Sequence, residues 1–246
     1  MAASRVSGAA RLVLASAVVL SSVVVLSATA EAAGVAAPTA SSVLSAAKSA
    51  IGKQSSVHLE VRSSSGSGSV EEELRADLAK TSGIETISEG TGTVVIKVTP
   101  TSAYLSGDSS GLTKILGLTA AEAKKVGRDW VTLKSGTSQY KTLATSISVS
   151  SVGSILPPAK GTRVFTPAPA AKKVYTLKWD TAATSSAPAL VSSLTLSAVG
   201  ATLPVEEITT ASGAGKQTVV LSKWGEQVLV SAPPAGSTIP LSKVTG

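Results

Sequence analysis

The segment Gly107-Asp-Ser-Ser-Gly111 matches the pattern G-x-S-x-G, in which a sharp turn between a strand and a helix exposes a nucleophilic serine. Acyl transfer by such a serine, here Ser109, needs a histidine that takes its proton, and in this motif the histidine follows the serine in the chain. The single histidine, His58, precedes Ser109. We interpret the motif as a polar turn after a strand and keep a serine hydrolase as the weakest of three hypotheses.

A second motif, Ser45-Ala-Ala-Lys48, matches the S-x-x-K of penicillin-recognising enzymes, and Lys134-Ser-Gly136 imitates their K-T-G element. Their third element, S-D-N, cannot exist here because the chain contains no asparagine. A Ser-x-x-Lys pair arises readily by chance in an alanine-rich helix. The motif therefore predicts a solvated helix face, and we expect no catalytic residue and no enzyme.

Metal, cofactor and nucleic-acid sites also lack their residue types. The chain has no cysteine, which excludes disulfides, thiolate ligands, cysteine nucleophiles and a lipobox. His58 has no histidine partner for a metal, and the run Glu71-Glu72-Glu73 alternates between faces if it is a strand, so we interpret it as a solvated charge run. The net charge is +7, but the basic residues are scattered along the chain and only 3% of the residues are aromatic, so nucleic-acid binding is not expected.

The first residues are typical of a secretory signal peptide. Arg5 and Arg11 precede an uncharged run from Leu12 to Leu26, which is followed by small residues at Ala28, Ala30 and Ala32. The run is shorter than the ~20 residues that cross a bilayer. Residues 1–32 are therefore predicted to be a cleaved signal, with cleavage after Ala30 as an alternative, and residues 33–246 a single domain. We expect a secreted, extracytoplasmic protein without a lipid anchor.

Changes of hydrophobic period divide the rest of the chain into short elements. Thr39 to Ile51 predicts a helix ending at Gly52, and Ser63 to Ser69, all serine and glycine, predicts a flexible turn. A helical insertion spans 107–127 with a Thr-x-x-Glu capping box at 119–122, and 147–156 predicts another short helix. Strands are predicted at 57–61, 70–80 (also compatible with a helix), 84–89, 93–98, 103–106, 130–133, 162–166, 174–179, 190–196, 203–209, 217–223 and 227–230.

This order of elements predicts an α+β fold with one large antiparallel sheet and helices on one face. The core is aliphatic, because 43% of the residues are hydrophobic and few are aromatic. Such a body is compatible with a cavity for an apolar ligand. The candidate ligand-binding residues are Tyr104, Leu112, Ile115, Leu116, Leu118, Trp130, Ile147, Ile155 and Leu156.

Seven short segments occur along the chain in a recognisable order, at 56–59, 74–77, 103–107, 128–131, 203–207, 222–226 and 230–234. On these segments, from Val57 onward, the sequence resembles the actinobacterial lipoproteins of the LppX/LprG kind, relatives of the LolA lipoprotein carriers. The resemblance implies a strongly curved antiparallel half-barrel whose concave face is covered by short helices, with a hydrophobic cavity for acyl chains between them. The missing lipobox cysteine departs from that family and favours free secretion.

The first hypothesis for function is a secreted, non-catalytic carrier that binds lipid or another hydrophobic small molecule between sheet and helices and releases it elsewhere. The second is a structural or interaction module of the cell envelope, with the same sheet but a filled core. We expect a monomer without cofactors, and a membrane or cell-wall surface as a further partner.

Overall fold

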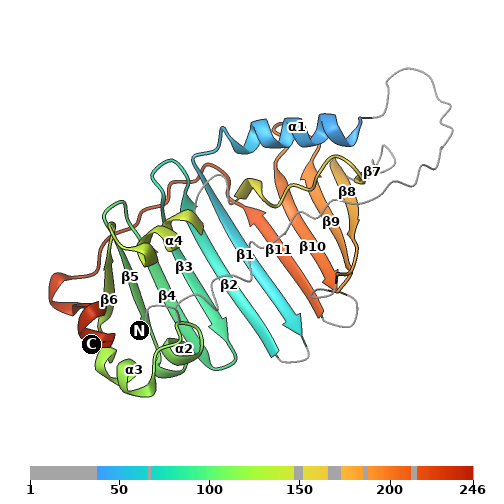
Figure 1. Cartoon of the computed structure of the whole chain (residues 1–246). Coiled ribbons are helices and arrows are strands. Elements are labelled where there is room, and N and C mark those ends of the chain that lie inside the picture. Colours follow the sequence, from blue (N-terminus) through green and yellow to red (C-terminus); the bar gives the residue numbers. More distant parts are fainter. Residues whose placement is uncertain are drawn as a thin grey trace, which may run out of the picture.

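The computed structural model describes residues 38–65, 68–146, 152–165, 173–184, 188–211 and 215–245. Its strands form one 12-stranded sheet in the order β12-β6-β5-β4-β3-β2-β1-β11-β10-β9-β8-β7 (Figure 1). The strands are β1 (Ser56–Ser65), β2 (Gly68–Asp77), β3 (Ser82–Glu89), β4 (Gly92–Val98), β5 (Ser102–Gly107), β6 (Trp130–Lys134), β7 (Arg163–Phe165), β8 (Val174–Thr181), β9 (Leu190–Ser197), β10 (Pro204–Ala211), β11 (Gly215–Ser222) and β12 (Thr238–Pro240). The helices are α1 (Ala40–Ile51), α2 (Ser109–Lys114), α3 (Ala120–Val126), α4 (Ser138–Ser146), α6 (Leu241–Thr245) and the short 3-10 turn η1 (Ala235–Ser237).

The α+β class, with one large, open and curved sheet and few short helices, is confirmed. The sheet is mixed, however, because β12 pairs with β6 in parallel. This corrects the prediction of a purely antiparallel sheet. The parallel strand was missed because its three residues, of which Pro240 is one, are too short to show a period and lie at the edge, where proline is tolerated.

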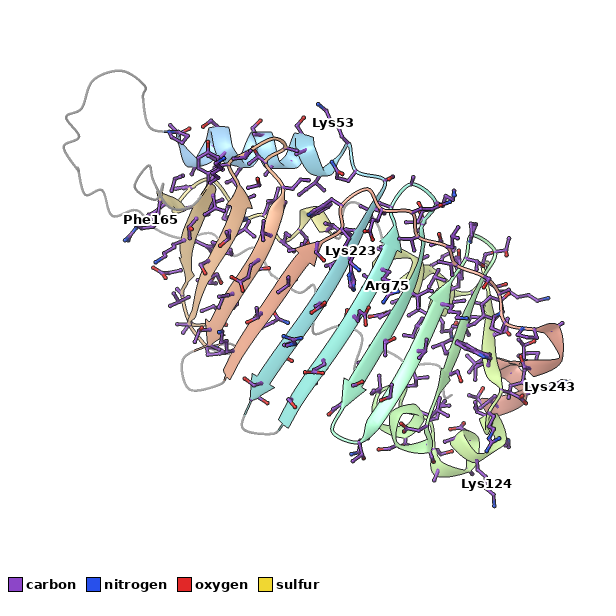
Figure 2. The ribbon with its side chains drawn as sticks, turned by 180° about the vertical axis from the view of Figure 1, so that it is seen from behind. Lys53, Arg75, Lys124, Phe165, Lys223 and Lys243 are labelled. Atoms are coloured by element: carbon purple, nitrogen blue, oxygen red, sulfur yellow. The ribbon has the colours of Figure 1, made fainter. Side chains whose placement is uncertain are left out.

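Strict alternation along the strands gives the sheet two different faces. Cross-strand pairing places Leu74, Leu59 and Leu221 side by side on one face, which we call the helix face. His58, Arg75 and the other residues of opposite parity form the second face, which we call the charged face (Figure 2). The same alternation continues from β6 to β7, apart from one register shift between Pro204 and Glu206 on β10, so one face of the whole sheet collects most of the apolar side chains.

Helix α1 covers one end of the helix face. Thr39 caps its first turn by accepting a hydrogen bond from the backbone N–H of Ser42. Buried side chains of α1 pack against β8 and β9 and form a separate apolar cluster. This cluster consists of Val43, Leu44, Ala47, Leu177, Leu194 and Leu196.

The capping box predicted for the helical insertion is present at the start of α3. The Thr119 hydroxyl accepts from the backbone N–H of Glu122, and the Glu122 carboxylate accepts from the backbone N–H of Thr119 at 2.7 Å. We expect Thr119→Ala to lower the free energy of unfolding by about 1 kcal/mol, measured by urea denaturation. Thr119→Ser keeps the oxygen and serves as the control. Equal stability of the alanine variant and the natural chain would show that the cap contributes nothing.

Helix α2 lies unusually close to the sheet because glycines line the contact. A methyl group added at Gly111 would collide with the carbonyl oxygen of Thr93 on β4, and one added at Gly92 would lie 2.8 Å from the backbone nitrogen of Gly111. We expect Gly111→Ala to displace α2 and to cost about 1 to 3 kcal/mol of unfolding free energy in thermal or urea melts. Gly136→Ala, where a methyl group meets open space, is the matched control. Similar losses in both variants would contradict this role of Gly111.

Three other predictions were wrong in detail. Helix α4 was missed, because Ser138–Ser146 has few apolar residues; it is anchored by the Tyr140 hydroxyl, which donates to the backbone oxygen of Thr99 at 2.7 Å. The predicted turn at 63–69 is mostly strand, since β1 and β2 pair as far as Ser65 and Gly68. No strand forms at 227–230, because the chain there must travel from β11 to β12, at the far edge of the sheet.

Candidate functional site

The helix face of the sheet is a continuous apolar surface. A large buried cluster joins strands β1 to β6 and β11 with residues of α2, α3, α4 and α6. Its centre consists of short rows of aliphatic side chains from neighbouring strands. The row Leu74, Leu59 and Leu221 crosses β2, β1 and β11, and Val61 and Val219 stand beside each other in the next row.

The described helices approach this face near its two ends. Helix α1 packs on β8 and β9 through its side chains, while α2 and α4 lie against β3 to β6 (Figure 1). Twelve strands at about 4.8 Å spacing make the sheet about 50 Å wide, whereas the 12 residues of α1 extend for about 18 Å. The apolar centre on β1, β2 and β11 therefore lies between the two groups of helices, and its side chains are buried, with Leu59, Val61 and Leu221 only 6%, 3% and 2% exposed. It is the candidate ligand-binding region, and a ligand would have to take the place of side chains that now cover it.

Most of the predicted ligand-binding residues lie on the helix side of the sheet. All of those that the structure describes in the helical insertion and near 155 are buried in the large cluster or packed against it. Leu156 also packs against the α1 cluster, so it links the two. Ile147 lies outside the described residues. Those brought together are Leu112, Ile115, Leu116, Leu118, Ile155 and Leu156.

Tyr104 and Trp130 are not brought together with these residues. Tyr104 pairs with Lys97 and Thr132, while its neighbour Leu105 is buried on the helix face. The Lys97 ammonium lies over the Trp130 ring, 4.7 Å from its centre. Both aromatics therefore belong to the charged face, and their placement in a chamber under the helices is wrong. Val131 and Leu133 lie on the helix face, and because side chains alternate along a strand, Trp130 lies on the other face.

Glu72, the middle residue of the run 71–73, lies on the helix face of the sheet. Glu72 is 9% exposed, whereas Glu71 is exposed and Glu73 faces the other side. Desolvation by burial raises the pKa of Glu72 to about 9, and the neighbouring Glu85 carboxyl contributes through its charge and a hydrogen bond. Burial also raises the pKa of Glu85. The interpretation of this run as wholly solvated is therefore wrong for Glu72, which is a protonated hydrogen-bond donor at neutral pH.

A third carboxyl, Glu207 on β10, lies in the same cross-strand row as Glu72. Glu207 pairs with Val219, Val219 with Val61, and Val61 with Glu72. The two carboxyls are separated by three strand spacings, or about 14 Å. Burial raises the pKa of Glu207 to about 7, against a weaker opposing effect of the Thr209 hydroxyl.

The next row toward the end of β1 is polar. Cross-strand pairs connect Ser63 with Gln217, Gln217 with Thr209, and Thr209 with Ser192. The hydroxyls of Ser192 and Thr209 are hydrogen-bonded at 2.9 Å. We call these four residues the polar row. The helix face thus changes from aliphatic, near α1, to hydrogen-bonding at the opposite strand ends.

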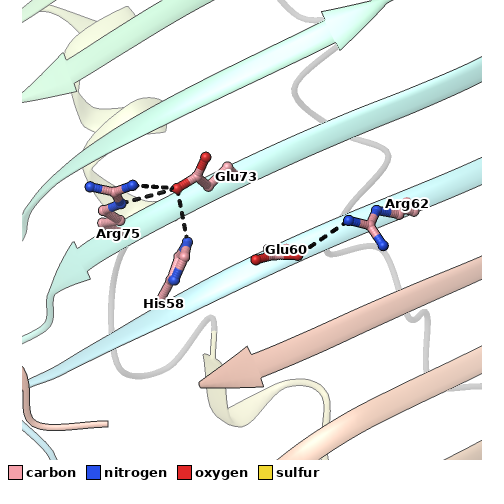
Figure 3. Close-up of polar contacts among 5 residues, drawn as sticks. All are labelled: His58, Glu60, Arg62, Glu73 and Arg75. Carbon is pink, nitrogen blue, oxygen red and sulfur yellow. Dashed lines mark hydrogen bonds and ion pairs between the residues drawn. The ribbon is translucent and has the colours of Figure 1, made fainter. Parts of the chain in front are cut away.

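The charged face carries a network of ion pairs (Figure 3). His58 Nε2 lies 3.0 Å from Glu73 Oε1, and the same oxygen accepts from Arg75 Nη2 at 2.7 Å. The hydrogen bonds from Arg75 hold the pKa of the Glu73 carboxyl below its usual range, and His58 adds to this effect. A hollow beside this network is lined by Glu73, Arg75, Ile84 and Thr86.

His58 and Ser109 cannot form the nucleophile and base of a hydrolase. His58 lies on the charged face and bonds Glu73, whereas Ser109 begins α2, which packs on the helix side. Asp108 caps α2 by accepting from the backbone N–H groups of Gly111 and Thr93. We expect no labelling of the purified protein by a fluorophosphonate probe. Labelling that disappears in Ser109→Ala would contradict this.

The residues of the second enzyme motif are also far apart. Ser45 and Lys48 are exposed on α1, which packs on β8 and β9, whereas Lys134 ends β6 near the opposite edge of the sheet. The solvated helix face predicted for this motif is confirmed. Among the described residues, no group of three or more histidine and carboxylate side chains is placed to hold a metal ion.

Comparison with family models gave no match, and no curated protein matches the sequence. A similar solved structure is the lipoprotein LppX of Mycobacterium tuberculosis. The two chains are 17% identical with a TM-score of 0.43, and the alignment covers 77% of this chain and 98% of LppX. The family that the sequence resembles stays a prediction at this level, and the fold is described from the strand order of this chain itself. In the described part of the chain, no helix has the length and apolarity needed to span a membrane.

Proposed function

We propose that the chain is a non-catalytic carrier that binds a lipid or another hydrophobic small molecule on the helix face, between the sheet and its helices. The observation that carries the proposal is the continuous apolar centre on β1, β2 and β11, between α1 at one end and α2 and α4 at the other. These side chains are buried in the chain itself, so a ligand would bind by displacing part of their cover, and each methylene of the ligand that is buried contributes about 0.8 kcal/mol.

The small size of the helices supports release as well as binding. Helices α2 and α3 have six and seven residues, so each is held by few side chains, and opening would require α2 to leave its close contact with β4 at Gly92 and Gly111. Leu112 on α2 and Ile115, which follows its last residue, are buried in the large apolar cluster. Movement of α2 would admit or release a ligand without any bond being made or broken.

The proposal extends to where the protein acts. The first 32 residues fit a secretory signal, and the chain has no cysteine for a lipid anchor. A freely exported monomer that exchanges its ligand at a membrane or cell-wall surface accounts for both features.

The test is extraction of protein purified without detergent from its native host. Organic extraction followed by mass spectrometry is expected to return a hydrophobic molecule in near-stoichiometric amount. Extracts without such a molecule, from protein that also fails to bind the apolar probe N-phenyl-1-naphthylamine, would overturn the proposal and favour a filled structural module.

A further inference from the structure

The two faces of the sheet differ in where their basic residues lie. Every lysine and arginine of the described strands has the parity of the charged face, which also carries carboxyls such as Glu73, whereas the acidic side chains of the helix face have no base beside them on that face. The basic residues are Arg62, Arg75, Lys97, Lys134, Arg163, Lys178 and Lys216, and the acidic side chains of the helix face are Glu72, Glu85, Glu89 and Glu207.

The described helices add no base to the helix side. Their lysines, including Lys48, Lys114 and Lys141, are exposed and point away from the apolar clusters. A negatively charged headgroup on the helix face would therefore meet no lysine or arginine of the described strands and helices, and it would lie near Glu207, whose pKa of about 7 leaves the carboxyl partly ionised at neutral pH. In a partly desolvated site this repulsion is weakly screened.

The position of the polar groups gives the site a direction. The aliphatic row Leu74, Leu59 and Leu221 lies nearer to α1, while the polar row of Ser63, Gln217, Thr209 and Ser192 lies toward the opposite strand ends. Between them stand Glu72 and Glu207, with Val61 and Val219 in the same row. Hydroxyl, amide and protonated carboxyl groups both donate and accept hydrogen bonds.

We propose that the helix face selects an amphiphile with an uncharged, hydroxyl-bearing headgroup and excludes anionic lipids. The headgroup lies against the polar row and Glu207, and the acyl chain extends along Val61, Leu59 and Leu221 toward α1. This inference rests on the carrier function proposed above and adds the class and orientation of the ligand.

The experiment compares two probes with the same chain, 1-monolauroylglycerol and laurate, as competitors of N-phenyl-1-naphthylamine on the full chain at neutral pH. The uncharged glyceride is expected to bind at least about tenfold more tightly than laurate. In Glu207→Gln this preference should shrink, because one source of repulsion is gone. Glu206→Gln, the neighbouring residue on the charged face, should leave it unchanged.

The outcomes separate the two levels of the proposal. If laurate binds as tightly as the glyceride or more tightly, the selection is wrong while the carrier function stands. If neither competitor nor the fluorescent probe binds, both are overturned. An equal change of preference in Glu206→Gln and Glu207→Gln would show that net charge decides, and not the helix face.

Discussion

Glu72→Gln is expected to be more stable than the natural chain above pH 7 and about equally stable near pH 4. Burial raises the pKa of the Glu72 carboxyl to about 9 in the folded chain, whereas its ordinary pKa of 4.5 applies once the chain unfolds. Between these values unfolding releases a proton, so stability falls as pH rises, by up to about 1.4 kcal/mol for each pH unit. The amide keeps the shape and removes this loss.

The size of the effect depends on the neighbouring carboxyl. Glu85 also has a raised pKa and is hydrogen-bonded to Glu72, so the two titrate as a pair and the gain at pH 7.5 is about 2 to 4 kcal/mol as an upper range. Urea denaturation at pH 4.5, 6, 7.5 and 8.5 measures it. Glu71→Gln, on the exposed face of the same strand, controls for the loss of a charge. A pH profile of Glu72→Gln parallel to that of the natural chain would contradict the assignment.

The double variant Val61→Thr/Val219→Thr is expected to lose ligand affinity with little change of shape. Both side chains are β-branched, so strand preference and volume are retained. Val61 and Val219 are 3% and 4% exposed, so each new hydroxyl is buried without a built partner and also lowers the free energy of unfolding. Against an apolar ligand the unpaired hydroxyl costs about 1 to 3 kcal/mol. The dissociation constant of N-phenyl-1-naphthylamine should rise about tenfold or more for each substitution.

The control for this variant is the next residue along the same strand. Val220 is half-buried on the charged face and pairs with Glu60 and Glu206, so Val220→Thr should leave probe binding unchanged. Unchanged binding in Val61→Thr/Val219→Thr, with thermal unfolding showing that it folds, would place the ligand elsewhere.

Alternation in the sequence accounts for most of the sheet and for part of the site. It correctly places Val57, Leu59 and Val61 on one face, and the same rule puts Glu72 on the face of Val70 and Leu74. The buried carboxyl was therefore predictable from its position between two apolar residues of equal parity. It was missed because alternation was used only to exclude a metal site in the run 71–73, and not to ask which face its middle residue takes.

Other features depend on partners distant in the sequence. Tyr104 lies in the short strand β5. Which side of the sheet its neighbours Ala103 and Leu105 face is settled only when β5 pairs with β4 and β6. The alignment of Glu72 with Glu207 depends on the register of strands far apart in the chain. No local pattern contains these facts.

Photo-crosslinking tests the central claim most directly. The full chain is loaded with a monoacylglycerol that carries a diazirine in the middle of its acyl chain, irradiated, digested and sequenced by mass spectrometry. The expected adducts lie on helix-face residues of β1 and β11, at Leu59, Val61, Val219 or Leu221. Adducts confined to the charged face, at His58, Glu60 or Val220, would contradict a ligand held between the sheet and its helices.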